Sequence, residues 1–170
     1  MRHHPLPLAL CLALLLAAIL PDALAETPTM HAHSPPASSG AQPMVAPPDT
    51  RDLVAFPAML RAHTLANMRD HLQTVAEIQE LLGAGRLDAA GDLAEQRLGM
   101  SSLPLHGADQ VAPYMPKGMQ DAGTAMHRAA SQFAIATRDA SVSGDTKAAM
   151  AALAHVTATC VSCHAKYRLE

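Results

Sequence analysis

The chain has 170 residues and a formal net charge of −3 at pH 7, with 12 Lys and Arg against 15 Asp and Glu. A nucleic-acid-binding protein is expected to carry a basic stripe, so this mildly acidic balance argues against such a partner. The sequence has no Trp, two Tyr and two Phe. Its core must therefore be built from Ala, Leu, Met and Val, which suits closely packed helices and leaves space for a bulky group that is not a side chain.

The first 25 residues have the pattern of a secretory signal peptide. Arg2 and two histidines precede an apolar run over residues 6–20, and the segment from Pro21 to Ala25 ends in an A-x-A-type cleavage sequence. The run is shorter than the roughly 20 residues of a membrane-spanning helix, and retention as an N-terminal anchor is the alternative. We expect cleavage after Ala25 and export to the periplasm, which leaves two of the three cysteines in the mature chain.

Residues 26–52 are rich in Pro, Ser, Thr and Ala and show no apolar period. This composition is typical of a flexible or polyproline-like linker. Met30, His31 and His33 lie within it and carry side chains that copper prefers. Because nothing fixes the geometry of these side chains, a plain disordered tail is the simpler interpretation.

From residue 53 to residue 170 the apolar residues recur at helical spacing, which predicts one all-α domain. The first helix is expected from about Val54 to Leu82, before a helix-ending pair of glycines, and the second over about 87–98. A long connection over 100–116, with three prolines, leads to a third helix that starts near Lys117. The fourth helix is expected after Ser143, Gly144 and Asp145, which offer an N-cap.

The apolar stripes of these helices predict an antiparallel four-helix bundle with one long crossover between its second and third helices. No segment alternates with period two over enough residues to be a strand. The stripe residues are Leu65, Met68, Leu72, Val75 and Leu82 in the first helix, Met119, Ala122, Met126, Ala129, Phe133 and Ala136 in the third, and Leu153, Val156, Cys160 and Cys163 in the fourth.

The last expected helix ends in Cys160-Val161-Ser162-Cys163-His164. Spacings of three and four residues put both cysteines and the histidine on one side of a helix. C-x-x-C-H is the attachment sequence of c-type haem, in which two thiols form thioethers with one porphyrin and the imidazole ligates the iron. The motif predicts one covalent haem c per chain, held by Cys160 and Cys163, with its iron on His164.

Other uses of a cysteine pair agree less well with the sequence. A structural disulfide across two residues would constrain little of the unfolded chain. A redox dithiol is expected near a helix N-terminus, where the helix dipole lowers the thiol pKa, whereas this motif lies at a helix C-terminus. A structural zinc site needs a fourth ligand at a matching spacing, and the sequence has no second cysteine pair.

A haem-attachment motif at the C-terminal end of a four-helix chain resembles the class II cytochromes c, the cytochrome c-prime family. The resemblance covers about Leu53 to Glu170, and its most specific part is the C-x-x-C-H-x-x-Y-R ending over 160–168. It implies that His164 is the proximal iron ligand and that Arg168 borders the proximal face of the haem. The alternative for Arg168 is a solvated charge that complements the helix dipole. A homodimer formed through the first two helices is also implied.

The same resemblance implies that the first helix forms the distal wall of the haem pocket. Family members have an arginine followed four residues later by the distal residue, and the stretch from Arg61 to Met68 fits this pattern without gaps. Leu65 would then lie over the iron, Arg61 beside the haem propionates and Met68 on the same wall. Ordinary core packing is the alternative for Leu65 and Met68, since both lie on the apolar stripe.

The distal residue decides between two functions. A distal methionine gives six-coordinate iron suited to electron transfer, whereas an apolar side chain leaves the sixth position vacant. The register favours Leu65, and a small shift would make Met68 or Met59 a ligand. We expect a periplasmic monohaem cytochrome, not an enzyme, that exchanges one electron with redox partner proteins. The alternative is a five-coordinate haem protein that binds nitric oxide or carbon monoxide under Leu65.

Four further histidines receive no role from these patterns. Each is expected to be a surface or partly buried polar residue. His71, on the flank of the first helix, could titrate near the haem edge and so modulate the haem potential. These residues are His71, His106, His127 and His155.

Overall fold

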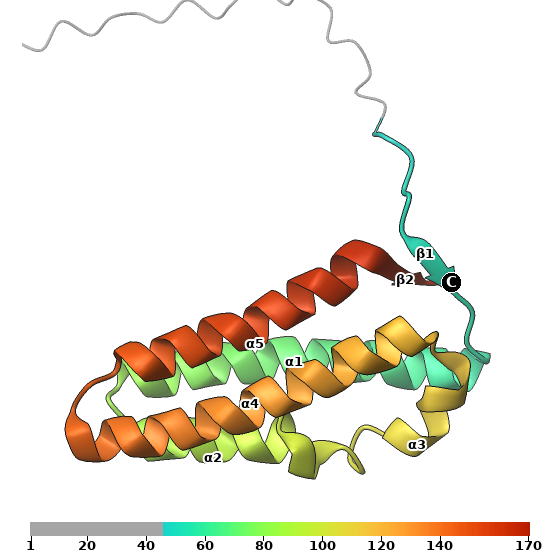
Figure 1. Cartoon of the computed structure of the whole chain (residues 1–170). Coiled ribbons are helices and arrows are strands. Elements are labelled where there is room, and N and C mark those ends of the chain that lie inside the picture. The colour runs from blue at the N-terminus through green and yellow to red at the C-terminus, as the bar shows by residue number, and fades with distance from the viewer. Residues whose placement is uncertain (1–45) are drawn as a thin grey trace, which may run out of the picture. The chain divides into compact units, whose positions relative to one another are not determined.

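A computed structural model describes residues 46–170, of which Pro47–Glu170 form one compact unit. Helices dominate this part of the chain (Figure 1), so the predicted helical fold class is confirmed at that level. The predicted signal peptide and most of the predicted linker lie outside the described residues. The long helices are α1 (Ala58–Gly83), α2 (Leu87–Arg97), α4 (Lys117–Ser143) and α5 (Lys147–Lys166), and the connection between α2 and α4 contains η1 (Met100–Ser102), α3 (Ala108–Val111) and η2 (Ala112–Tyr114).

The first helix begins four residues later than predicted, at Ala58. Pro57 directly precedes it, where the fixed φ of proline suits a helix start and its missing N–H costs nothing. At the other end Gly85 has φ +70°, a left-handed conformation that favours glycine. The amides of Gly85 and Arg86 donate to the carbonyl oxygens of residues 82 and 81, at 3.0 and 2.8 Å. This is a Schellman ending, and it confirms the predicted glycine stop.

The start of the last helix follows the predicted turn. Gly144 closes α4 with φ +76°. The carboxylate of Asp145 accepts a hydrogen bond of 3.0 Å from the backbone N–H of Lys147, the first residue of α5. A side-chain oxygen thereby satisfies one of the amides that a helix start leaves without a partner.

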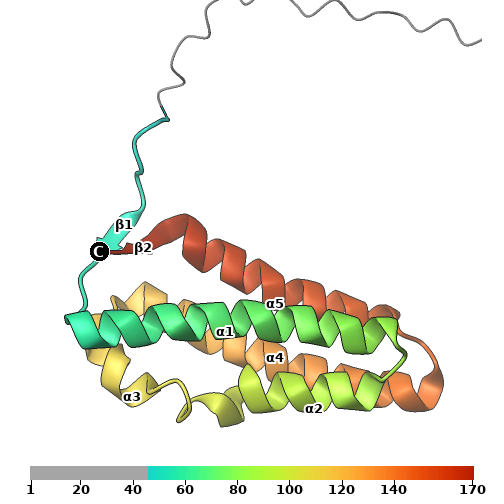
Figure 2. The same cartoon turned by 180° about the vertical axis from the view of Figure 1, so that it is seen from behind.

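Two short strands correct the prediction that the domain contains none. β1 (Asp52–Val54) and β2 (Tyr167–Leu169) pair in parallel, with Asp52 opposite Tyr167. Each strand has three residues, which is too short to show a period of two, and each finds its partner at the other end of the domain. The pairing brings residues 52–54 beside the C-terminal end of the chain (Figures 1 and 2).

Helix α4 is central to the packing, because it contacts α2 on one side and α5 on the other, while α2 also contacts α1. Consecutive long helices run in opposite directions (Figures 1 and 2). Many of the core residues are alanines, which let the helix backbones approach closely. The buried core consists of Ile78, Ala90, Ala94, Leu98, Met126, Ala129, Ala130, Phe133, Leu153 and Val156.

The predicted apolar stripes reach this core only in part. The middle of the third stripe, around Phe133, and the pair Leu153 and Val156 are buried, as predicted. Leu72 is 73% exposed, so the prediction that it faces inward is wrong. The first stripe fails there because α1 packs beside α2 and the α2–α4 connection, and the polar residues Thr74 and His71 occupy part of its buried face.

Gly91 of α2 lies in close contact with α4. A Cβ at this position would overlap the hydroxyl of Thr137 and lie 3.1 Å from the carbonyl oxygen of Ala134. The Thr137 hydroxyl in turn donates to that same carbonyl oxygen at 2.9 Å, within α4. Backbone atoms cannot move aside as a flexible side chain would, so glycine is required by the helix contact.

The substitution Gly91→Ala should therefore destabilise the domain by about 1–3 kcal/mol, the usual cost of overpacking. Urea unfolding followed by circular dichroism measures the change. Gly83→Ala is the matched control, because a Cβ there meets no atom within 4 Å. The control should stabilise α1 by up to about 1 kcal/mol through helix propensity. Equal effects of the two substitutions would contradict the close approach at Gly91.

Candidate functional site

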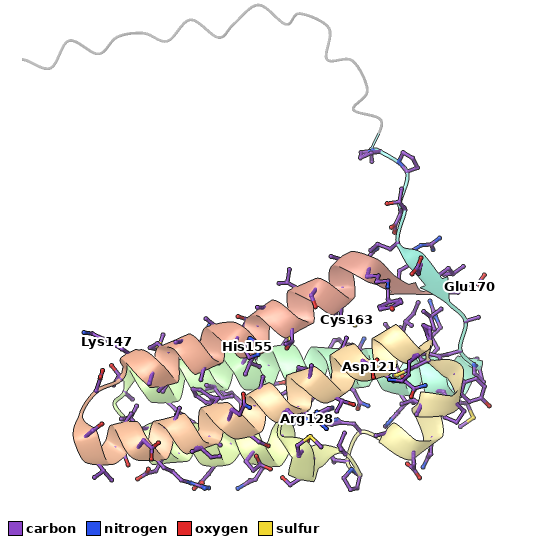
Figure 3. All side chains as sticks on the ribbon, in the orientation of Figure 1. Asp121, Arg128, Lys147, His155, Cys163 and Glu170 are labelled. Carbon is purple, nitrogen blue, oxygen red and sulfur yellow. The ribbon has the colours of Figure 1, made fainter. Side chains whose placement is uncertain are left out.

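The motif residues Cys160, Cys163 and His164 lie in the last turns of α5. Figure 3 labels Cys163 near the C-terminal end of this helix. Both cysteines are half-buried and free of a disulfide, and His164 is exposed. The helix continues through all three residues to Lys166. Their spacing on a continuous helix places two thiols and one imidazole on the same side within about one turn.

The end of α5 that carries the motif is poorly covered by the rest of the described domain. Val156, one turn before Cys160, is the last residue of α5 that is buried in the core. By length and composition α5 is apolar enough to cross a membrane, yet only 17% of its most apolar stretch is buried. In both views the C-terminal end of α5 diverges from α1 (Figures 1 and 2).

The residues between Val156 and His164 have small side chains. None is larger than valine, and several are threonine, serine or alanine. A helix normally buries a wide apolar stripe against its neighbours. Here the half-buried cysteines lie on a stripe that residues 46–170 leave partly uncovered.

The environment of the two thiols disfavours their ionisation. Burial raises the pKa of the Cys160 thiol. Burial also raises the pKa of the Cys163 thiol, and the neighbouring Cys160 adds to that shift. A nucleophilic redox cysteine needs the opposite shift, toward a stable thiolate. The site is therefore poorly suited to thiol–disulfide exchange.

Residues just before β1 hold the chain that follows the motif. The guanidinium of Arg51 donates to the carbonyl oxygen of His164 at 3.3 Å and pairs with the carboxylate of Asp49 at 2.7 Å. Hydrogen bonds from Arg51 hold the pKa of Asp49 well below its usual range. Asp49 also lies 3.6 Å from Arg168 Nε. Since α5 ends at Lys166, Arg168 is a strand residue of β2 and not a continuation of the helix.

Tyr167 anchors the same end of the chain to α4. Its side chain is buried, and its hydroxyl lies so close to Gly118 that a Cβ there would overlap it. The ammonium of Lys166 lies 5.3 Å from the centre of the Tyr167 ring, within cation–π distance. Tyr167, through α4, and Arg168, through Asp49, therefore both hold the C-terminal segment in place next to the cysteine pair.

The predicted residues of α1 occupy different environments. Arg61 is exposed, and Leu65 and Met68 are half-buried. Met68 lines a cavity of about 200 Å³ between α1, α4 and the turns that connect α2 to α4. Arg61, Leu65 and the three motif residues do not line it. The structure thus brings the motif residues together on α5 and places Met68 in a separate cavity wall.

Three histidines of that cavity were not expected from the sequence to be buried. His71, His106 and His127 are 9%, 6% and 7% exposed, which corrects the prediction of surface or partly buried residues, whereas His155 is exposed. The ring centres of His71 and His106 are 4.5 Å apart, and their Nε2 atoms are 3.3 Å apart. The three come from α1, the α2–α4 connection and α4, so no sequence spacing links them.

Burial controls the charge of this histidine cluster. It lowers the pKa of His71 to about 4, with the neighbouring His106 as the next cause. It also lowers the pKa of His127, whose Nδ1 lies 2.8 Å from the carbonyl oxygen of Leu98. These two imidazoles are therefore neutral at pH 7.

A comparison of the chain with known protein families, curated proteins and solved structures finds no match. The resemblance to class II cytochromes c rests on the residues of this chain alone. It remains a prediction, and the function has to be argued from the site itself.

The His71 environment predicts that the domain loses stability in mild acid. Between its ordinary pKa of 6.5 and its folded-state pKa of about 4, the unfolded chain binds a proton that the folded chain does not. The free energy of unfolding should therefore fall as the pH drops through this window, by at most about 3 kcal/mol from His71. Urea unfolding at pH 7, 5.5 and 4 measures the slope.

The variant His71→Asn should flatten that slope, and the exposed His155→Asn should leave it unchanged. The contribution of His127 should persist in both variants. An unchanged slope in His71→Asn would contradict the assignment of acid sensitivity to the buried cluster.

Proposed function

We propose that this chain is an exported monohaem c-type cytochrome of the class II type, an antiparallel four-helix bundle that transfers one electron in the periplasm. Its haem would be attached to Cys160 and Cys163 and ligated by His164. One observation carries the proposal: these three residues share one side of the last turns of α5, beyond the last fully buried residue of that helix.

The residues present fit such a group. Two protonated, half-buried thiols one helical turn apart are spaced to hold one porphyrin, and the adjacent imidazole is exposed and free to ligate a metal. The uncovered apolar stripe of α5 would be buried by the porphyrin face, which offsets the cost of leaving that surface in water. When bound, the haem supplies the one-electron chemistry of its iron.

The chain's own residues would set the geometry of that site. The Arg51–Asp49 pair and the β1–β2 pairing hold the backbone at His164 and beyond, so the imidazole is presented from a fixed end of the helix. Arg61 is exposed on the first turns of α1 and is available to pair with a haem propionate. Redox partner proteins would exchange an electron with this haem.

Purification of the chain from a host that matures c-type cytochromes tests the attachment. Mass spectrometry of the denatured protein should show the mature polypeptide plus one haem, because thioether bonds survive denaturation. The double variant Cys160→Ala, Cys163→Ala should carry no covalent haem. Ser162→Ala, on the same helix between the two thiols, is the matched control and should retain it. A bare polypeptide mass in the unmodified protein would end the proposal.

The distal side of the haem separates electron transfer from gas binding. Met68 lies in the wall of a cavity that none of the motif residues lines. The register of the first helix, in which Leu65 follows Arg61 by four residues, leads us to propose that Leu65 and not a methionine forms the distal side. A vacant sixth position would allow the alternative function, the binding of nitric oxide or carbon monoxide.

The variant Met68→Ala should therefore leave the optical spectrum of the haem unchanged, in both oxidation states. Carbon monoxide should shift the Soret band of the reduced protein, as expected for five-coordinate iron. A change from low-spin to high-spin spectra in Met68→Ala would instead identify Met68 as the sixth ligand, and the protein would then be a plain electron carrier.

A further inference from the structure

The cavity that contains the histidine cluster is large enough for a small organic molecule. Its volume is about 200 Å³, and an apolar cavity of about 150 Å³ is known to hold benzene. One buried water needs only about 10–15 Å³, so a single water molecule would not fill it. Most of its wall is apolar, and the apolar side chains include Met68, Leu103, Val111, Met115 and Met126.

Two buried polar atoms in the residues that line this cavity have no hydrogen-bond partner within residues 46–170. They are the hydroxyl of Thr64 and the Nδ1 atom of His106. Thr64 is 4% exposed and His106 is 6% exposed. A buried polar group without a hydrogen bond is costly, so an occupant of this cavity that offers hydrogen bonds to these atoms would stabilise the protein.

The partners of His106 define what that ligand must offer. Its Nε2 lies 2.9 Å from the carbonyl oxygen of Arg97, which can only accept, so Nε2 carries the proton. In the neutral ring Nδ1 is then an acceptor, and the ligand must donate to it. The Thr64 hydroxyl can donate or accept. A single hydroxyl on the ligand could donate to His106 and accept from Thr64.

The surroundings favour an uncharged aromatic ligand. Asp70 and Arg97 form an ion pair with each other, so their opposite charges cancel and leave no net charge to attract an ionic ligand. No group of three or more His, Cys, Asp or Glu within residues 46–170 is arranged to hold a metal ion, so the cluster is poorly suited to a cation. Three methionine thioethers line the cavity, and thioether sulfur makes favourable contacts with aromatic rings.

We propose that this cavity binds a small uncharged aromatic alcohol of the phenol class, whose ring contacts the methionines and whose hydroxyl bridges His106 and Thr64. The proposal does not rest on the haem. It assigns to the buried histidines a recognition role that is independent of electron transfer.

Calorimetric titration of the purified, mature full-length protein with phenol, anisole and toluene tests this site at pH 7. Phenol should bind once per chain and raise the thermal midpoint in proportion to its occupancy. Anisole, which cannot donate, and toluene, which has no oxygen, should each bind about tenfold more weakly, because both leave His106 without a partner.

Two variants locate the binding. Gly123 lines the cavity, and a Cβ added there would meet no atom within 4 Å. The leucine side chain of Gly123→Leu should therefore enter the open space and abolish phenol binding. Gly83→Leu, outside the cavity, is its control. Thr64→Val keeps the side-chain shape and should weaken phenol about tenfold while leaving toluene unchanged.

If Gly123→Leu fails to fold, the Thr64→Val comparison decides alone. Three results would overturn the proposal: no saturable phenol binding, phenol binding that persists in a folded Gly123→Leu protein, or equal affinity for phenol and toluene. In the first case ordered water would be the occupant of the cavity.

Discussion

The packing of α5 against α4 is the interaction on which the candidate site depends. It places Leu153 and Val156 in the core, whereas Cys160, one turn later, only partly packs against that core, and the helix continues to Lys166. Between Val156 and His164 the side chains are small and the two cysteines are only half-buried. A helix that ends its own burial just before a C-x-x-C-H motif has an apolar stripe that lacks a partner, and a covalently attached group on the same stripe would supply one.

The second constraint acts at the end of that helix. Without support, three residues after a helix would fray. Here β2 pairs with β1, Tyr167 packs over Gly118, and Arg51 holds the carbonyl oxygen of His164. The segment before α1 therefore stabilises the C-terminal end of the chain through these contacts. A rigid end of α5 is what an iron-ligating imidazole would require, since small displacements of a ligand change its bond to the metal.

On the other side of α1 the protein tolerates a cluster of buried polar groups. Within residues 46–170, three buried imidazoles and a threonine hydroxyl that has no hydrogen-bond partner line this cavity. Such an arrangement lowers the free energy of unfolding, because each buried polar group without a hydrogen bond has lost its hydration and gained no partner in exchange. The proposed binding site gives a reason for a cavity that is kept open at this cost, and it is independent of what the motif on α5 carries.

The sequence by itself determined the helices, the glycine stop after α1 and the position of the cysteine–histidine motif, because these follow from local spacing and turn chemistry. It missed β1 and β2, which pair with each other although they lie more than a hundred residues apart in the sequence. It also missed the histidine cluster, whose members lie on three separate elements. It also misjudged Leu72, since the inward face of α1 is chosen by its neighbours and not by hydrophobicity alone. Only the tertiary structure decided which stripe residues are covered, because burial depends on the surfaces that meet.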